Sequence, residues 1–132
     1  MHLIVCLGAR DGMSFCGRRL SRDRAVSEHI LRLTAGKTLW CAPESAMLFP
    51  EGTVSISPDF QEKAGRGEYC FLETGPWPSA AEMESITVYN WNRTYPYSVK
   101  FPKEILRTMQ PVTIEEFAGF SHEKITMTRF AP

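Results

Sequence analysis

Short apolar runs, separated by turn residues and amphipathic segments, constrain the fold of this chain most strongly. Residues 3–7 are five consecutive apolar side chains, a pattern typical of a strand that is buried on both faces. Further strand-like runs follow at 38–41, 53–56, 69–72 and 86–89. Helix-like segments lie between several of these runs, so their order predicts crossover connections and a mostly parallel sheet.

The first helix is predicted by its hydrophobic spacing. Val26, Ile30 and Leu33 stand at positions i, i+4 and i+7, so they share one face of a helix. Ser21 is a suitable N-terminal cap, and Gly36 stands just beyond the expected end. We therefore expect an amphipathic helix that packs on the sheet.

Start signals and polarity patterns predict the remaining elements. Proline with acidic residues at the start indicates helices at 43–49 and 57–65. Residues 112–117 and 124–130 alternate in polarity, which predicts a closing antiparallel hairpin. The fold class we expect is a single three-layer α/β domain over residues 1–132. Its central sheet is mostly parallel, with helices on both faces and the antiparallel hairpin at the C-terminus.

Composition limits the broad class of the protein. The formal net charge is zero and 43% of the residues are hydrophobic, which fits a globular domain without a global attraction to nucleic acid or membranes. The first apolar run is too short for a signal peptide, and no run approaches the roughly 20 apolar residues of a membrane span. We expect a soluble cytoplasmic protein. The four cysteines and three histidines share no ligand spacing, so we expect free thiols and no metal site.

A cluster of arginines follows the first predicted strand. Half of the chain's ten arginines lie within residues 10–24, in a loop that begins at Gly8, contains Gly12 and Gly17 and precedes a helix N-terminus: Arg10, Arg18, Arg19, Arg22 and Arg24. Guanidinium groups and the free amides of a helix N-terminus both favour phosphate or carboxylate. One reading is therefore an anion-binding loop. The alternative is a solvated loop whose arginines pair with the nearby acids Asp11, Asp23 and Glu28.

Two side chains are the best candidates for proton chemistry. Asp23 lies at the start of the predicted helix, near the expected mouth of a ligand site, although an acid there is also favoured by the helix dipole. His122 lies in the polar segment before the last strand, and a histidine titrates near neutral pH. The same segment is also typical of a hairpin turn. We predict Asp23 and His122 as catalytic candidates and leave the turn reading open.

An aromatic loop follows the strand predicted at 86–89. Trp91, Arg93 and Tyr95 combine flat rings with a cation, and such side chains can stack on a base or another ring ligand. A long crossover loop packed by its own aromatic residues is the alternative. We include the three residues among the predicted ligand-binding positions.

The order of these segments resembles the dihydrofolate reductase family. The apolar strand at 3–6 leads to Asp-Gly-Met at 11–13 and Cys-Gly at 16–17. This succession is similar to the family's first strand and the flexible loop that follows it.

The resemblance extends along the chain. Residues 37–41 are similar to the family's second strand, residues 57–64 to its late Ser-x-x-x-Ala helix, and residues 68–72 to the strand that ends in its double glycine. The resemblance implies a dihydrofolate-reductase-like core with a small-molecule site.

The cofactor and substrate motifs differ from the family's pattern. Ala-Pro-Glu-Ser at 42–45 replaces its Gly-Arg-x-Thr/Ser, and Glu-Thr-Gly at 73–75 replaces its Gly-Gly. Asp23 is the one possible counterpart of the carboxylate in its substrate site. These changes remove the phosphate contacts on which nicotinamide binding depends, so the resemblance implies a repurposed relative rather than a reductase.

Two segments resemble a second group of proteins. Trp-Asn-Arg-x-Tyr-Pro at 91–96 and Ser-His-Glu-Lys-Ile-Thr at 121–126 are similar to segments of short bacterial proteins. Some of these carry the name of a tRNA-processing nuclease, whose His-x-His-x-Asp-His metal motif does not occur here. Our first hypothesis is a protein that binds an anionic or phosphorylated small ligand on the dihydrofolate-reductase-like core. The alternative is a non-enzymatic RNA-binding or protein-interaction module.

Overall fold

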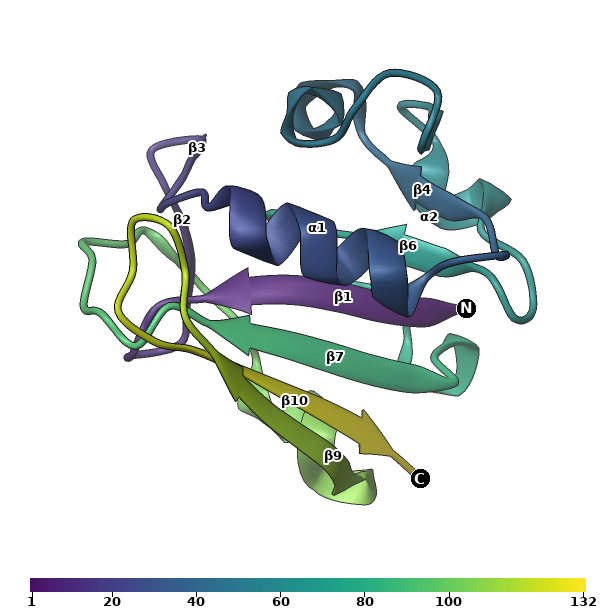
Figure 1. Ribbon diagram of the computed structural model, residues 1–132. Helices are drawn as coiled ribbons and strands as arrows, with labels where there is room; N and C mark the ends of the chain where they lie inside the picture. Colours follow the sequence, from purple (N-terminus) through teal and green to yellow (C-terminus); the bar gives the residue numbers. More distant parts are fainter.

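A seven-stranded sheet forms the centre of the computed structural model, which describes all of residues 1–132 (Figure 1). The strand order is β5-β4-β6-β1-β7-β10-β9. Neighbouring strands from β5 to β7 run parallel, and β10 is antiparallel to both β7 and β9. In chain order the strands are β1 (His2–Leu7), β4 (Leu39–Cys41), β5 (Ser55–Ile56), β6 (Tyr69–Phe71), β7 (Ser85–Asn90), β9 (Gln110–Phe117) and β10 (Ile125–Ala131).

This sheet confirms the predicted fold class. Each strand-like run of the sequence forms a strand, and the last two strands make the expected antiparallel hairpin. The central strand β1 alternates between two hydrophobic clusters, with Leu3, Val5 and Leu7 in one and Ile4 in the other. The run at 3–7 is continuously apolar because both faces of the sheet are covered.

The ten-residue helix α1 (Arg24–Leu33) covers one face of the sheet. Its buried residues Val26 and Ile30 pack in the cluster that contains Ile4, and Figure 1 shows the helix lying over the sheet. The cap is Asp23, whose side chain accepts a hydrogen bond from the amide of Ala25. The prediction of Ser21 as the cap is wrong, because the extended cap backbone and that bond occur two residues later. No helix is long enough to cross a bilayer, since α1 is the longest.

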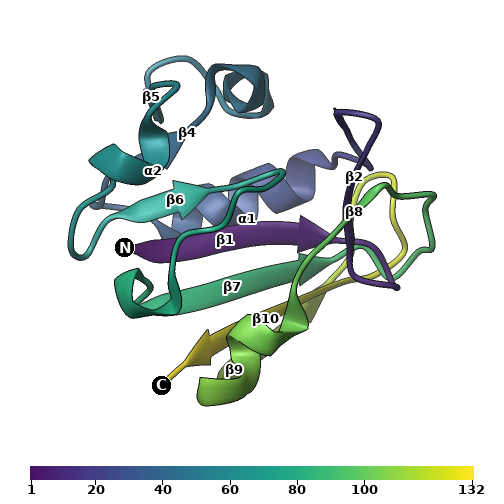
Figure 2. The same ribbon diagram turned by 180° about the vertical axis from the view of Figure 1, so that it is seen from behind.

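Short helices and loops complete the cover of both faces. Ala46 and Leu48 pack in the cluster of α1, whereas Phe60, Ile105 and Leu106 pack in the cluster on the opposite face, which Figure 2 shows from its own side. The helix predicted at 43–49 is a 3-10 helix, η1 (Pro43–Leu48), and the helix predicted at 57–65 is reduced to α2 (Phe60–Lys63). Two more 3-10 helices are η2 (Ala80–Glu82) and η3 (Lys103–Thr108). α2 ends at Ala64, whose backbone is extended with φ −63° and ψ 113°.

The segment between β1 and α1, predicted as a loop, contains two strands. β2 (Gly12–Phe15) and β3 (Arg18–Arg19) form a hairpin, and β8 (Val99–Lys100) extends it to a second sheet of order β3-β2-β8. Cys16 and Gly17 connect the hairpin with positive φ angles of 49° and 76°. Two consecutive positive φ angles are the signature of the tight turn that suits a two-residue hairpin.

All four cysteines are free. Cys16 is exposed at the hairpin turn, whereas Cys41 and Cys70 are buried in strands. Burial raises the pKa of the Cys41 thiol to about 11 and that of the Cys70 thiol to about 12. Burial also raises the pKa of the Cys6 thiol.

Candidate functional site

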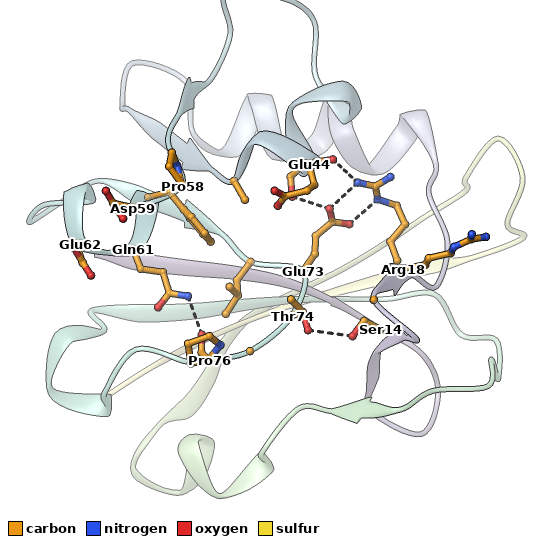
Figure 3. A pocket seen from close by; sticks show the side chains of 17 residues that line it. Ser14, Arg18, Glu44, Pro58, Asp59, Gln61, Glu62, Glu73, Thr74 and Pro76 are labelled. Atoms are coloured by element: carbon orange, nitrogen blue, oxygen red, sulfur yellow. Dashed lines mark hydrogen bonds and ion pairs between the residues drawn. The ribbon is translucent and has the colours of Figure 1, made fainter.

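A cleft of about 780 Å³ lies at the carboxyl ends of β4, β5 and β6, beside the β2–β3 hairpin (Figure 3). Its wall comes from the segments that follow these three strands and from the hairpin itself. This is the edge at which parallel α/β sheets bind ligands. The volume falls within the range of about 300–1,000 Å³ that is common for small-molecule sites.

An ion pair forms the inner wall of the cleft. The Arg19 guanidinium donates from Nε to Glu73 Oε2 at 2.8 Å and from Nη2 to Glu73 Oε1 at 2.9 Å. The same Nη2 donates to the carbonyl of Glu44 at 2.8 Å, and Ser45 Oγ donates to Glu73 Oε1 at 2.7 Å. The hydrogen bond with Glu73 raises the pKa of Arg19. Arg19 is therefore already neutralised and held in place.

The remaining charges separate along the cleft. Arg18, which is exposed, lies at one end, and Asp59 and Glu62 lie at the other (Figure 3). Glu44 is exposed between them. The Arg18 side chain extends from the rim, away from Glu73 and Thr74 (Figure 3). The cleft therefore has acids at one end and an arginine at the opposite rim, and it offers an oriented site to a ligand with two different polar ends.

Two small cavities lie behind the ion pair. One, of about 20 Å³, is lined largely by apolar side chains that include Val26, Phe49 and Trp91. The second, of about 10 Å³, has Ser21 in its wall. Glu73 lines both cavities as well as the outer cleft, so it stands between the inner space and the open site.

Asp23 and His122 meet beside these cavities. Although they are 99 positions apart, His122 Nδ1 lies 2.9 Å from Asp23 Oδ2, and both side chains are almost fully buried. Asp23 Oδ1 also accepts the amides of Ala25 and Phe120, and its Oδ2 accepts the amide of Ser121 at 2.9 Å. The carboxylate thus caps α1 and ties the helix to the β9–β10 loop.

The hydrogen bonds keep Asp23 ionised. Burial alone would raise the pKa of this carboxyl group, but donors from Phe120, His122, Ser121 and Ala25 outweigh it and hold the pKa of Asp23 well below its usual value. An ionised carboxylate can only accept a hydrogen bond. His122 therefore donates from Nδ1, and in the tautomer that carries its single proton there, Nε2 is an acceptor.

Two hydroxyl groups approach the free Nε2 atom of His122. Ser21 Oγ and Tyr95 Oη each lie 3.0 Å from it, and Tyr95 Oη donates to Ser21 Oγ at 3.3 Å. The Trp91 ring stacks on the His122 ring with a centroid distance of 4.7 Å. We call Ser21, Asp23, Tyr95, Trp91 and His122 the histidine cluster.

The predicted aromatic loop contributes Trp91 and Tyr95 to the histidine cluster. Trp91 is 4% exposed, so its faces are occupied inside the protein, and Tyr95 is half-buried with its hydroxyl on His122. Arg93 is exposed and donates to the Ser121 carbonyl at 3.3 Å. The rings therefore pack the loop and, in this conformation, Trp91 offers no surface for stacking on a base.

The predicted arginines do not converge on one site. Arg18 and Arg19 are neighbours on a strand, so their side chains point to opposite sides. Arg24 lies 3.8 Å from Glu28 and 4.8 Å from the centre of the Phe120 ring. Arg10, Arg18, Arg22 and Arg24 are all exposed. Of the five, only Arg18 and Arg19 line the cleft.

Two residues of the site were not predicted from the sequence. Glu73 directly follows a strand-like run, so its place at the carboxyl edge of a parallel sheet was available as a signal. Ser21 was expected only as a helix cap, and nothing in the local sequence indicates its contact with His122. No group of three metal-ligating side chains occurs in the structure.

The fold has a known counterpart among solved structures. Dihydrofolate reductase from Enterococcus faecalis, solved as a complex with NADP(H) and RAB-propyl, superposes with a TM-score of 0.68 and 11% sequence identity. The match covers 98% of this chain and 94% of that chain. No family model and no curated protein matches the sequence. The chain thus has a dihydrofolate-reductase-like fold, as the sequence resemblance implied, whereas nothing supports the resemblance to the nuclease.

Proposed function

We propose that the protein binds a small molecule in the cleft beside the β2–β3 hairpin. The observation that carries this proposal is the cleft itself, which is about 780 Å³ in volume and lies at the carboxyl ends of three parallel strands. The similar fold of a dihydrofolate reductase that was solved with NADP(H) supports small-molecule binding. The fold alone does not determine the ligand.

The charge separation suggests how the ligand is oriented. Arg18 is free to bind a phosphate or carboxylate, whereas Arg19 is engaged by Glu73. Asp59 and Glu62 favour hydrogen-bond donors at the opposite end. We therefore propose a ligand with an anionic group toward Arg18 and donor groups toward the two acids. A ligand with several phosphates is disfavoured, because acids outnumber arginines in the lining.

A thermal-shift scan tests this proposal. The compounds are nucleoside monophosphates, nicotinamide dinucleotides, folates and a short RNA, each at low and at high salt. A ligand at 100 times its dissociation constant stabilises the native state by about 2.7 kcal/mol. We expect stabilisation by a small compound with an anionic and a donor end, and a loss of that stabilisation in Arg18→Glu.

A matched variant separates the cleft from overall charge. Arg66 is exposed before β6, outside the cleft. Arg66→Glu changes the net charge as much as Arg18→Glu does, and it should leave the stabilisation unchanged. Equal loss of stabilisation in both variants, or no stabilisation by any small compound, would contradict the proposal.

RNA binding is the alternative function. The exposed side chains of Arg10, Arg22, Arg24 and Arg93 support it, and the burial of Trp91 counts against base stacking. Stabilisation by RNA alone, weakening steeply with salt, would favour this alternative over the small ligand.

A further inference from the structure

We propose that Ser21 is a nucleophile activated by His122 and Asp23, and that the protein cleaves esters of short apolar carboxylic acids at this residue. The three side chains form a serine–histidine–aspartate relay. This inference concerns the histidine cluster and does not depend on the ligand of the outer cleft.

The distances run in the order that nucleophilic catalysis requires. Ser21 Oγ lies 3.0 Å from His122 Nε2, and His122 Nδ1 lies 2.9 Å from Asp23 Oδ2. Hydroxyl, base and orienting carboxylate must each be within hydrogen-bond reach of the next. Ser121, a second serine beside the cluster, lies on the Nδ1 side of the ring and donates to Asp23. Of these two serines, Ser21 is the one whose hydroxyl reaches Nε2.

The surroundings fix the orientation of the imidazole. Asp23 is almost fully buried and accepts from Nδ1, so the ring turns Nε2 toward the two hydroxyl groups and, with its single proton on Nδ1, offers Nε2 as the base. Tyr95 Oη lies 3.0 Å from the same Nε2 and 3.3 Å from Ser21 Oγ, and when it donates to Ser21 Oγ the proton of Ser21 is directed at Nε2. Tyr95 thereby positions the serine hydroxyl as a donor to the base.

The cavities beside Ser21 indicate the substrate class. Ser21 is half-buried and lines both inner cavities, and the larger one is walled by Val26, Ile30, Phe49 and Phe71. These apolar walls fit the alkyl part of an acyl group. The volume of about 20 Å³ limits that part to very few carbon atoms, so an acetyl ester is the expected substrate.

The reaction balances with water as the co-reactant. Ser21 Oγ forms a bond to the ester carbonyl carbon while His122 Nε2 takes the serine proton. The carbon–oxygen bond to the alcohol breaks, and the alcohol leaves with that proton. Water then attacks the acyl-serine, giving up a proton to Nε2, which returns it to Ser21 Oγ as the carboxylic acid departs.

The first test treats the whole chain with a fluorophosphonate and locates the label by peptide mass spectrometry. The second treats it with p-nitrophenyl acetate and locates the acetyl group in the same way. We expect modification at Ser21. In Ser21→Ala no label should appear at that peptide, and in His122→Gln its rate should fall by at least about 100-fold. Ser21→Cys, which keeps a nucleophile at this position, should still be acetylated there.

Controls separate a catalytic cluster from a structural one. Ser79 is exposed in a different segment, and Ser79→Ala should label as fast as wild type. Asp23 is a positioning residue, so its test is the labelling rate of Ser21 measured across pH. In folded Asp23→Asn the maximal labelling rate should be lower than in wild type, and the pH at which the rate is half-maximal should also be lower. Failure of Ser21 to label in folded wild-type protein, or unchanged labelling in His122→Gln, would overturn the inference.

Discussion

Replacing Asp23 by asparagine tests the structural core of the histidine cluster. The two carboxylate oxygens accept bonds from Ala25, Phe120, Ser121 and His122. Asparagine has one acceptor oxygen, and its amino group carries donors. If that oxygen faces Ser121 and His122, the amides of Ala25 and Phe120 lose their acceptor.

The expected cost follows from these two amides. A buried donor without a partner costs about 1–3 kcal/mol, and water can reach Phe120, which is exposed, so we expect Asp23→Asn to lose about 2–4 kcal/mol of unfolding free energy. Domains of this size are stable by about 5–15 kcal/mol, so the variant should fold but unfold at clearly lower urea. The assay is urea unfolding at neutral pH.

The pH dependence of the unfolding free energy provides a second test of the hydrogen bonds to Asp23. The folded-state pKa of Asp23 is lowered, so its contribution is fully present above the unfolded pKa of about 3.9 and is lost as the pH falls toward the folded value. The difference in unfolding free energy between wild type and Asp23→Asn should therefore be smaller at about pH 3 than at neutral pH. Asp59→Asn is the control, because Asp59 is exposed and makes no side-chain capping bond; it should change stability by less than about 0.5 kcal/mol. A loss of less than about 0.5 kcal/mol in Asp23→Asn as well would refute the reasoning.

Three further predictions concern other parts of the fold. Gly119→Ala would place a methyl group 2.5 Å from Asp23 Oδ2, so we expect a loss of about 1–3 kcal/mol in urea unfolding; an unchanged midpoint would contradict it. Glu73→Gln removes the charge that holds Arg19, and since both side chains are about one fifth exposed, the loss should be about 1 kcal/mol, with a smaller salt dependence than wild type; equal salt dependence would count against the ion pair. Cys16 should be the one thiol that reacts rapidly with a disulfide reagent in the native protein, because the other three are held in strands whose burial raises their pKa; rapid reaction of more than one thiol would contradict this assignment.

The architecture was predictable because local pattern and sheet topology agree. Continuous apolar runs such as 3–7 indicated strands with two covered faces, and the alternating polarity of 112–117 and 124–130 indicated the hairpin. The β2–β3 hairpin was missed because its turn is Cys16-Gly17, which lacks the usual asparagine or aspartate signal.

The candidate site was predictable only in part, because its contacts join distant segments. Asp23 and His122 were singled out by residue type, but their contact depends on how the β9–β10 loop packs against α1. The cap is Asp23 rather than Ser21, and the same carboxylate accepts the long-range amides of Phe120 and Ser121, which a local window of sequence does not contain. Both serine and aspartate are good caps, so local propensity could not decide.

The contacts of the arginines at 10–24 also could not be predicted from the local sequence. The sequence left two interpretations open, an anion-binding loop or a solvated loop whose arginines pair with nearby acids. The structure pairs Arg24 with Glu28 but Arg19 with Glu73, which follows β6 more than fifty positions away. An ion pair between residues at the ends of different strands depends on the order of the strands in the sheet, so a short stretch of sequence does not predict it. Anion binding by Arg18 stays a prediction.

The most direct test of small-ligand binding in the cleft is an amide chemical-shift titration of isotope-labelled protein with adenosine monophosphate. This compound has a phosphate at one end and an amino group at the other. We expect saturable shifts at Arg18, Thr74 and Asp59, which line the cleft. No shift at these amides at millimolar concentration, or shifts confined to Arg10 and Arg93 outside it, would contradict the account.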